Sequence, residues 1–251
     1  MTHAGIDGYS RMIVFMKCSD NNRSATVYES FVNAVQCHSL PSRLRCDQGR
    51  ENILVAAYML EHRGSERRSV IVGSSVHNQR IERLWRDMHR CVTQLFYKLF
   101  YHLEYHNLLD PLNEAHLAAI HYIFLPRINQ ALGHFKEGWN NHSIRTAHNH
   151  SPYQLFVSGV LRLHRQGLVA TDFLDAVDDH YGITEEGLTS DDTAIEIPIN
   201  TFDLREDHFQ ELKRLIDPLS ESSNYGLDLY QECLDFYISM ISQHPTLYST
   251  V

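Results

Sequence analysis

The chain has 251 residues, of which 43% are hydrophobic and 21% are charged, and its formal net charge is −9. This composition is that of a globular protein with one large domain, or with one domain and an appendage. No apolar run approaches the ~20 residues needed to span a bilayer. The first residues have neither the basic nor the apolar region of a secretory signal, so we expect a protein that is neither secreted nor membrane-bound.

The charge is unevenly distributed along the chain. Residues 161–251 hold 18 acidic and 5 basic side chains, whereas residues 1–160 hold 13 acidic and 17 basic ones. A mildly basic body with an acidic tail indicates an anionic partner for the body. The five cysteines are scattered and never spaced as CxxC, which indicates reduced thiols and no cysteine-based zinc module.

The first 73 residues predict short strands alternating with helices. Asp7-Gly8 separates two apolar runs and predicts a β-hairpin. Asp47 stands at the end of the strand around Leu44, and Gly49 follows where the chain leaves the sheet. Strands that are short and apolar, separated by helices, favour an α/β layered domain. The expected strands lie at 2–6, 11–18, 44–47 and 69–73, and the expected helices at 24–37 and 51–62.

The remainder of the chain is predicted to be mainly helical. A long amphipathic helix begins near Asn78, and Pro111, Pro126 and Pro152 are expected to punctuate the helical stretch 100–160. The acidic stretch that follows contains one strand-like piece, Ala194–Ile199, and two helices are expected near 204–216 and 226–241. We therefore expect a core over 1–160, an acidic linker over 161–200 and a small helical segment over 201–251.

Asp47 and Glu82 lie 35 positions apart, one at a strand end and the other in the first turn of the long helix. Carboxylates so placed can converge on one divalent metal ion, as polynucleotide chemistry requires. Each residue also has a simpler interpretation. Asp47 can be a turn or cap residue before Gly49, and Glu82 can be a helix-surface acid that pairs with Arg86 at i+4.

Four motifs occur together and in order: Gly5–Phe15 (GIDGYSRMIVF), Cys46–Asn52 (CDQGREN), Ser75–Trp85 (SVHNQRIERLW) and Trp139–Leu155 (WNNHSIRTAHNHSPYQL). Together they resemble the catalytic core of retroviral-type integrases and related transposases, the DDE superfamily with a ribonuclease H-like fold. The similarity is greatest to integrase cores of mobile-element-derived animal proteins. It implies an α/β fold, with a mixed sheet flanked by helices, followed by a helical acidic C-terminal region.

The resemblance implies functions for particular residues. Asp47 matches the second aspartate of the family and Glu82 its glutamate, so both are implied as catalytic residues and as ligands of Mg²⁺ or Mn²⁺. DNA is the implied partner, metal-dependent DNA strand transfer (DNA integration) the implied activity, and a homo-oligomer the implied assembly, with no small-molecule cofactor. The implied location is the nucleus or the cytoplasm.

Basic and polar residues around Glu82 are candidates for binding DNA. Arg80, Arg83, Arg86 and Arg90 can track a phosphate backbone, although a solvated helix face explains them equally well. His77 and Asn78 can position DNA near the site, and Asn78 can alternatively cap the helix.

The sequence departs from the family pattern at the first catalytic aspartate. That residue belongs to a first, central strand that pairs with both the hairpin and the Asp47 strand, whereas Asp7 occupies the non-catalytic hairpin position. We expect an N-terminally truncated core whose first strand precedes Met1. A decayed copy, or a sheet completed by Ala194–Ile199, remains an alternative. Two functions follow: an integrase-like enzyme with impaired strand transfer, or a domesticated, non-catalytic module that binds nucleic acid or protein.

Overall fold

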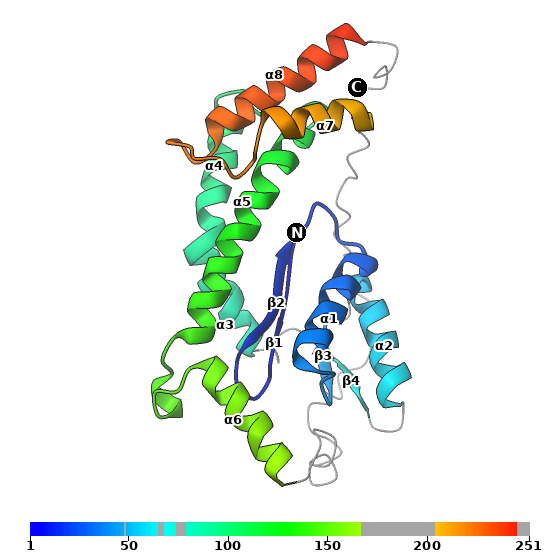
Figure 1. Ribbon diagram of the computed structural model, residues 1–251, viewed down its shortest axis with the longest axis vertical. Helices are drawn as coiled ribbons and strands as arrows, with labels where there is room; N and C mark the ends of the chain where they lie inside the picture. Colours follow the sequence, from blue (N-terminus) through cyan, green and yellow to red (C-terminus); the bar gives the residue numbers. More distant parts are fainter. Residues whose placement is uncertain (48, 65–67, 74–78, 167–203, 245–251) are drawn as a thin grey trace. The chain divides into compact units, whose positions relative to one another are not determined.

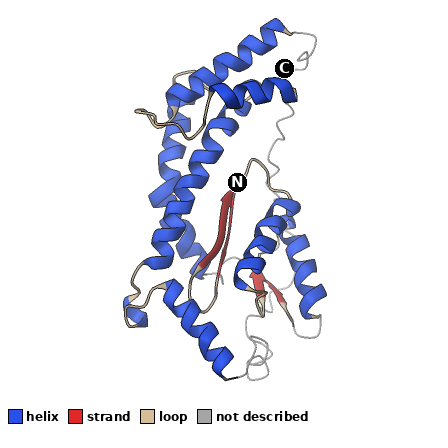
Figure 2. Cartoon of the chain, in the orientation of Figure 1, coloured by secondary structure: helices blue, strands red, loops and turns tan. Residues whose placement is uncertain are grey.

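The chain forms a mixed α/β structure that is mostly helical and has two small sheets (Figures 1 and 2). It divides into two compact units. The first comprises residues 1–87 and 134–197, and the second comprises residues 88–133 and 198–251. The computed structural model describes residues 1–47, 49–64, 68–73, 79–166 and 204–244.

The first unit begins with an antiparallel hairpin of β1 (Thr2–Ile6) and β2 (Ile13–Cys18). The Asp7 carboxylate organises the turn, because its Oδ2 accepts bonds from the backbone N–H groups of Tyr9 (3.2 Å) and Ser10 (2.6 Å) and from the Ser10 hydroxyl (2.6 Å). Arg11 adopts a positive φ of 65°, so the connection is longer than the two-residue turn that Asp-Gly predicted.

A second, parallel pair joins β3 (Leu44–Cys46) to β4 (Val70–Val72) in the same unit. Two helices accompany this pair, α1 (Ser24–His38) and α2 (Ile53–Arg63), the latter preceded by the 3₁₀ turn η1 (Arg50–Asn52). The two helices share a buried apolar cluster, against which side chains of β2, β3 and β4 pack. The fully buried members of the cluster are Val27, Phe31, Val55 and Met59.

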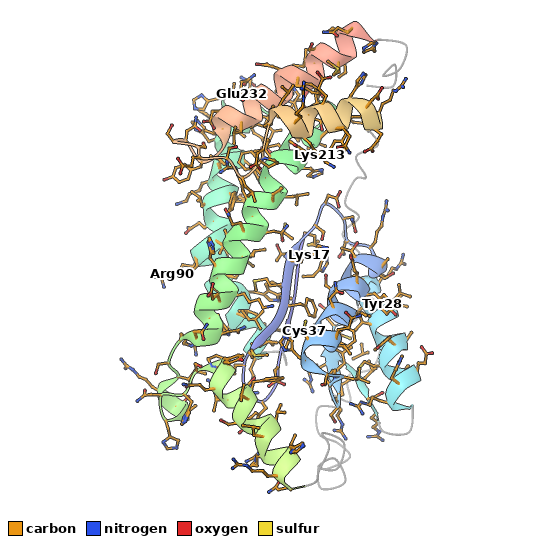
Figure 3. The ribbon with its side chains drawn as sticks, viewed as in Figure 1. Lys17, Tyr28, Cys37, Arg90, Lys213 and Glu232 are labelled. Atoms are coloured by element: carbon orange, nitrogen blue, oxygen red, sulfur yellow. The ribbon has the colours of Figure 1, made fainter. Side chains whose placement is uncertain are left out.

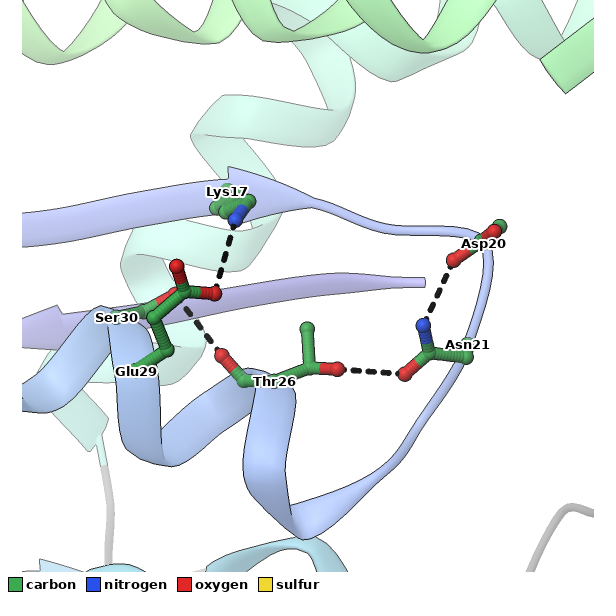
Figure 4. Close-up of polar contacts among 6 residues, drawn as sticks. All are labelled: Lys17, Asp20, Asn21, Thr26, Glu29 and Ser30. Carbon is green, nitrogen blue, oxygen red and sulfur yellow. Dashed lines mark hydrogen bonds and ion pairs between the residues drawn. The ribbon is translucent and has the colours of Figure 1, made fainter. Parts of the chain in front are cut away.

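Polar contacts connect β2 to the start of α1 (Figure 4). The Lys17 ammonium lies 3.6 Å from the Glu29 carboxylate. In the connecting loop, Asn21 donates to Asp20 (2.7 Å) and accepts from the Thr26 hydroxyl (2.7 Å). Asn21 thereby holds the first turn of α1, although its side chain does not act as the N-cap, which is Arg23.

Side chains from the C-terminal end of α5 (Glu114–Asn141) satisfy the backbone along β2. The Asn140 amide accepts from Ile13 N–H (2.8 Å) and donates to Ile13 C=O (3.0 Å), as a neighbouring strand would. Lys136 donates to Val14 C=O (3.0 Å), and the Trp139 indole N–H donates to Arg11 C=O (2.9 Å). The helix thus occupies hydrogen-bonding positions that another strand could have taken.

The remaining elements of the first unit are α3 (Gln79–Met88), which ends at the unit boundary, the 3₁₀ turn η4 (Arg145–Ala147) and α6 (Pro152–Arg165). α6 begins with a capping box, in which the Ser151 hydroxyl accepts from Gln154 N–H while the Gln154 side chain accepts from Ser151 N–H. The Tyr9 ring at the hairpin tip lies beside Gly159 of α6, and Arg162 stacks over it at 5.8 Å.

The second unit is helical. It contains the π-helical turn η3 (His89–Thr93), α4 (Gln94–Tyr105), the N-terminal part of α5, α7 (Glu206–Leu215) and α8 (Leu227–Gln243). Phe96 and Phe100 of α4 pack edge-on against Phe124 of α5, which also contacts Tyr230 of α8. Three side chains then bond distant backbone carbonyls: Tyr122 to Ile216 (2.8 Å), Arg127 to Ser220 (2.6 Å) and Tyr230 to Leu108 (3.0 Å).

The positions of the strands and helices agree with the sequence-based predictions to within a few residues where the structure describes them. Two expectations were wrong. Pro126 lies inside the 28-residue α5 instead of interrupting it, and the described strands form two separate two-stranded sheets instead of one mixed sheet. Ala194–Ile199 lies outside the described residues. No helix in the described part of the chain is long and apolar enough to cross a bilayer.

Candidate metal and DNA-binding site

Asp47 follows directly after β3, as the sequence predicted, and its side chain is exposed. The parallel pairing of β3 and β4 continues to this point, because Gly73 N–H donates to Cys46 C=O (3.3 Å). One carboxylate oxygen, Oδ1, accepts a hydrogen bond from the Asn52 side-chain amide (2.8 Å). The bond restricts the Asp47 side chain, and among the described residues the other oxygen has no partner.

The turn after Asp47 requires a glycine. A Cβ atom at Gly49 would overlap the Glu51 carboxylate, which folds back over this residue. Glu51 and Asp47 also affect the preceding thiol. Burial raises the pKa of Cys46 to about 11, and the two nearby carboxylates add to that rise. Cys46 therefore stays protonated at neutral pH and is a poor metal ligand.

Glu82 lies in the first turn of α3, where the partial positive charge of a helix N-terminus favours a carboxylate. Leu84 is fully buried and Met88 nearly so, whereas Glu82 is exposed. An i,i+4 ion pair on this helix joins Arg83 and Asp87 at 3.8 Å. The structure thus presents Glu82 to solvent from a helix that is anchored on its other face.

The arginines proposed to bind DNA are all exposed. Arg80, Arg83 and Arg86 lie on α3 in the first unit. Arg90 belongs to η3 in the second unit (Figure 3), so the structure does not bring it together with the other three. A π turn shifts the helical face by about one residue, which a regular 3.6-residue period could not predict. His77 and Asn78 lie outside the described residues.

Asp7 is not available as a replacement for the missing aspartate. Its Oδ2 holds the hairpin turn through three hydrogen bonds. This matches the hairpin position assigned to it from the sequence. Among the described residues, no group of three or more histidine, cysteine, aspartate and glutamate side chains could hold a metal ion.

Comparison with known protein families matches residues 1–170 to the model of the integrase core domain. The chain belongs to the integrase core domain family. No curated protein and no solved structure matches it. The family implies a ribonuclease H-like fold, binding to DNA and the use of divalent metal ions.

The integrase core contributes two exposed carboxylates, Asp47 and Glu82, whose oxygens are the donors that Mg²⁺ and Mn²⁺ prefer. The neutral Cys46 thiol beside Asp47 does not favour a thiophilic ion such as Zn²⁺. The donor chemistry of the site therefore fits the hard cations of the family.

Sequence reasoning did not assign a function to Asn52, which bonds directly to Asp47. The signal was present, because Asn52 is the last residue of the quoted motif CDQGREN. Its role became clear when the 3₁₀ turn η1 placed its amide beside the carboxylate.

Proposed function

We propose that this integrase core binds DNA and uses Asp47 and Glu82 as ligands of a Mg²⁺ or Mn²⁺ ion in DNA strand transfer. The observation that carries the proposal is the combination of an oriented carboxylate at the end of β3 with an exposed one in the first turn of α3, inside the matched family region. Two carboxylates provide only part of the usual ligand set, so the expected activity of this chain is low.

A bound divalent ion would lower the pKa of an attacking hydroxyl and stabilise the leaving oxygen of the phosphodiester. The residues of the chain supply the binding site. Asp47 and Glu82 offer oxygen ligands, and Asn52 restricts the rotation of Asp47. Arg80 and Arg86, both exposed on the helix of Glu82, are placed to contact phosphate groups of DNA.

A second candidate function is that of a non-catalytic module that binds DNA or protein. Two observations favour it. Asp7 is committed to its turn, and the described residues assemble no group of three metal-binding side chains. Under this proposal the fold and the basic helix are retained, while the carboxylates no longer serve catalysis.

A strand-transfer assay with labelled DNA duplexes distinguishes the two candidates. We expect weak Mn²⁺-dependent nicking or joining by the full chain and none by Asp47→Asn or Glu82→Gln, while all three proteins bind DNA alike. If the chain and both variants bind DNA but none reacts, the non-catalytic proposal holds. If the chain neither reacts nor binds DNA, both nucleic-acid proposals fail.

The basic face of α3 can be tested separately from the chemistry. Replacing Arg80 and Arg86 with glutamine should weaken DNA binding and make the salt dependence shallower by about one unit per lost phosphate contact. Arg214, an exposed arginine of α7, is the matched control, and Arg214→Gln should leave the slope unchanged.

A further inference from the structure

Three exposed tyrosines follow one another along α4. Tyr97, Tyr101 and Tyr105 are 67%, 62% and 76% exposed, and they recur every four residues. Side chains four residues apart lie on one face of a helix, about 6 Å apart along its axis. The three rings therefore form a continuous aromatic stripe, defined here as the tyrosine stripe.

The tyrosine stripe lies opposite the buried face of α4. The buried residues of this helix are Phe96, Leu99 and Leu103, and Phe96 packs against Phe124 of α5. The stripe is therefore not needed to hold α4 in its own unit. Large aromatic surfaces that are exposed and contiguous mark interaction sites in proteins.

Other tyrosines of the same unit show what a structural role looks like. Tyr122 and Tyr230 donate their hydroxyls to backbone carbonyls, and burial raises the pKa of each to about 12. In contrast, Tyr97, Tyr101 and Tyr105 present both ring and hydroxyl to solvent. Tyrosine provides a large contact area at low conformational cost, which is why it is enriched at protein interfaces.

The charge of the second unit argues against a nucleic-acid partner for the stripe. Its described residues include 6 lysines and arginines and 11 aspartates and glutamates, a net charge of −5. A polyanion would be repelled by this unit. A protein surface with its own aromatic groups and mixed charges is the better match.

We propose that the tyrosine stripe pairs with the same stripe of a second copy of this chain, with the two α4 helices antiparallel and related by a two-fold axis at Tyr101. In such a pair, residues whose numbers sum to 202 lie at the same height. Tyr101 then faces its own counterpart, and Tyr97 lies level with Tyr105 of the second copy. The stripe is thus complementary to itself, as a two-fold interface requires.

The charged residues beside the stripe fit the same arrangement. Lys98 and Glu104 are both exposed and flank Tyr101 on opposite sides of the helix. At 100° per residue, Lys98 lies on the side of Tyr105 and Glu104 on the side of Tyr97. The antiparallel pair places the Lys98 ammonium near the ring of Tyr105 of the second copy and Glu104 near the hydroxyl of Tyr97 of the second copy, both favourable contacts. A parallel pair would instead set the two Lys98 side chains at one height.

Sedimentation of the full chain over a range of concentrations tests this interface. We expect a monomer–dimer equilibrium whose dissociation constant rises at least about tenfold in Tyr101→Ser, since truncating one central aromatic costs more than about 1.4 kcal/mol. Tyr153→Ser removes a comparably exposed tyrosine from α6 and should leave the equilibrium unchanged. Circular dichroism confirms that each variant is folded.

Cysteine cross-linking tests the two-fold axis directly. In a chain whose exposed Cys37 and Cys91 are replaced with serine, Tyr101→Cys should form a disulfide-linked dimer on mild oxidation. A mixture of Tyr97→Cys and Tyr105→Cys chains should cross-link to each other more readily than either does to itself.

The proposal is overturned if the chain is monomeric at all concentrations, or if its dimer is unaffected by Tyr101→Ser. It is equally overturned if the cysteine at 101 does not cross-link, or if the stripe binds single-stranded DNA and loses it in Tyr101→Ser.

Discussion

The two units of the chain are stabilised in different ways. In the first, polar side chains of α5 bond the backbone of β2, and the amide of Asn140 alone makes two of these bonds. In the second, Phe124 and Tyr230 form an aromatic core that holds helices from distant parts of the sequence. A unit of small sheets depends on backbone hydrogen bonds that must be satisfied, whereas a helical unit depends on apolar burial. The proposed site lies on the first of these frameworks.

The largest effect is expected from removing the central aromatic of the second unit. Tyr230→Ala should reduce the free energy of unfolding by about 3–5 kcal/mol, because a fully buried aromatic side chain leaves a cavity. Tyr230→Phe keeps the ring and loses only the hydroxyl bond to Leu108, so about 1 kcal/mol is expected. Denaturant unfolding followed by circular dichroism measures both. Equal losses in the two variants would show that the ring does not carry the stability of this unit.

The corresponding test of the first unit is Asn140→Leu. This variant leaves the N–H and C=O of Ile13 without their side-chain partner, and a loss of about 1–3 kcal/mol is expected. The Ile13 amide should also exchange with deuterium faster. Asn141→Leu is the matched control, since Asn141 is exposed and bonds only within its own helix. If both variants lose the same stability, α5 does not close the edge of β2.

Two glycines of the second unit should respond with opposite signs to the same substitution. Gly226 has a φ of +95°, and an added Cβ would lie 2.8 Å from Arg127 Nε, so Gly226→Ala should destabilise by about 1 kcal/mol or more. Gly133 lies within α5 with open space around it, so Gly133→Ala should stabilise by about 0.5–1 kcal/mol. Thermal unfolding of the two variants measures both shifts. A stabilising Gly226→Ala would contradict the left-handed conformation of that residue.

The smallest effect on stability is expected at the proposed site. Asn52→Ala removes the bond to the exposed Asp47, so the free energy of unfolding should change by no more than about 0.5 kcal/mol. Affinity for Mn²⁺ should nevertheless fall about tenfold, because residues that orient a ligand contribute to metal binding. Titration calorimetry with Mn²⁺ provides the measurement. Unchanged affinity would show that Asn52 does not position Asp47.

Local patterns in the sequence predicted much of this structure. The Asp7-Gly8 turn, the short apolar strands and the helical period after Asn78 each specify neighbouring backbone, and the elements formed close to the expected residues. The ordered motifs also identified the family before the structure was known. Asp47 and Glu82 were located correctly on a strand end and a helix start, since both placements depend on local sequence.

Features that depend on distant contacts could not be predicted. Pro126 is accommodated within α5 even though it cannot donate a backbone hydrogen bond. The bonds from Asn140 to Ile13 join residues 127 positions apart, and the sequence contains no local signal for them. The π turn at His89–Thr93 also shifted Arg90 away from the face that a regular helix predicted. In each case, packing between remote segments determined the result.

The central claim is that Asp47 and Glu82 together bind a divalent metal ion, and Mn²⁺ binding followed by electron paramagnetic resonance tests it most directly. The account predicts one bound ion per chain, with affinity at least about tenfold weaker in Asp47→Asn and in Glu82→Gln, and unchanged in the control Asp87→Asn. Equal binding by all four proteins, or no binding by the unaltered chain, would contradict the account.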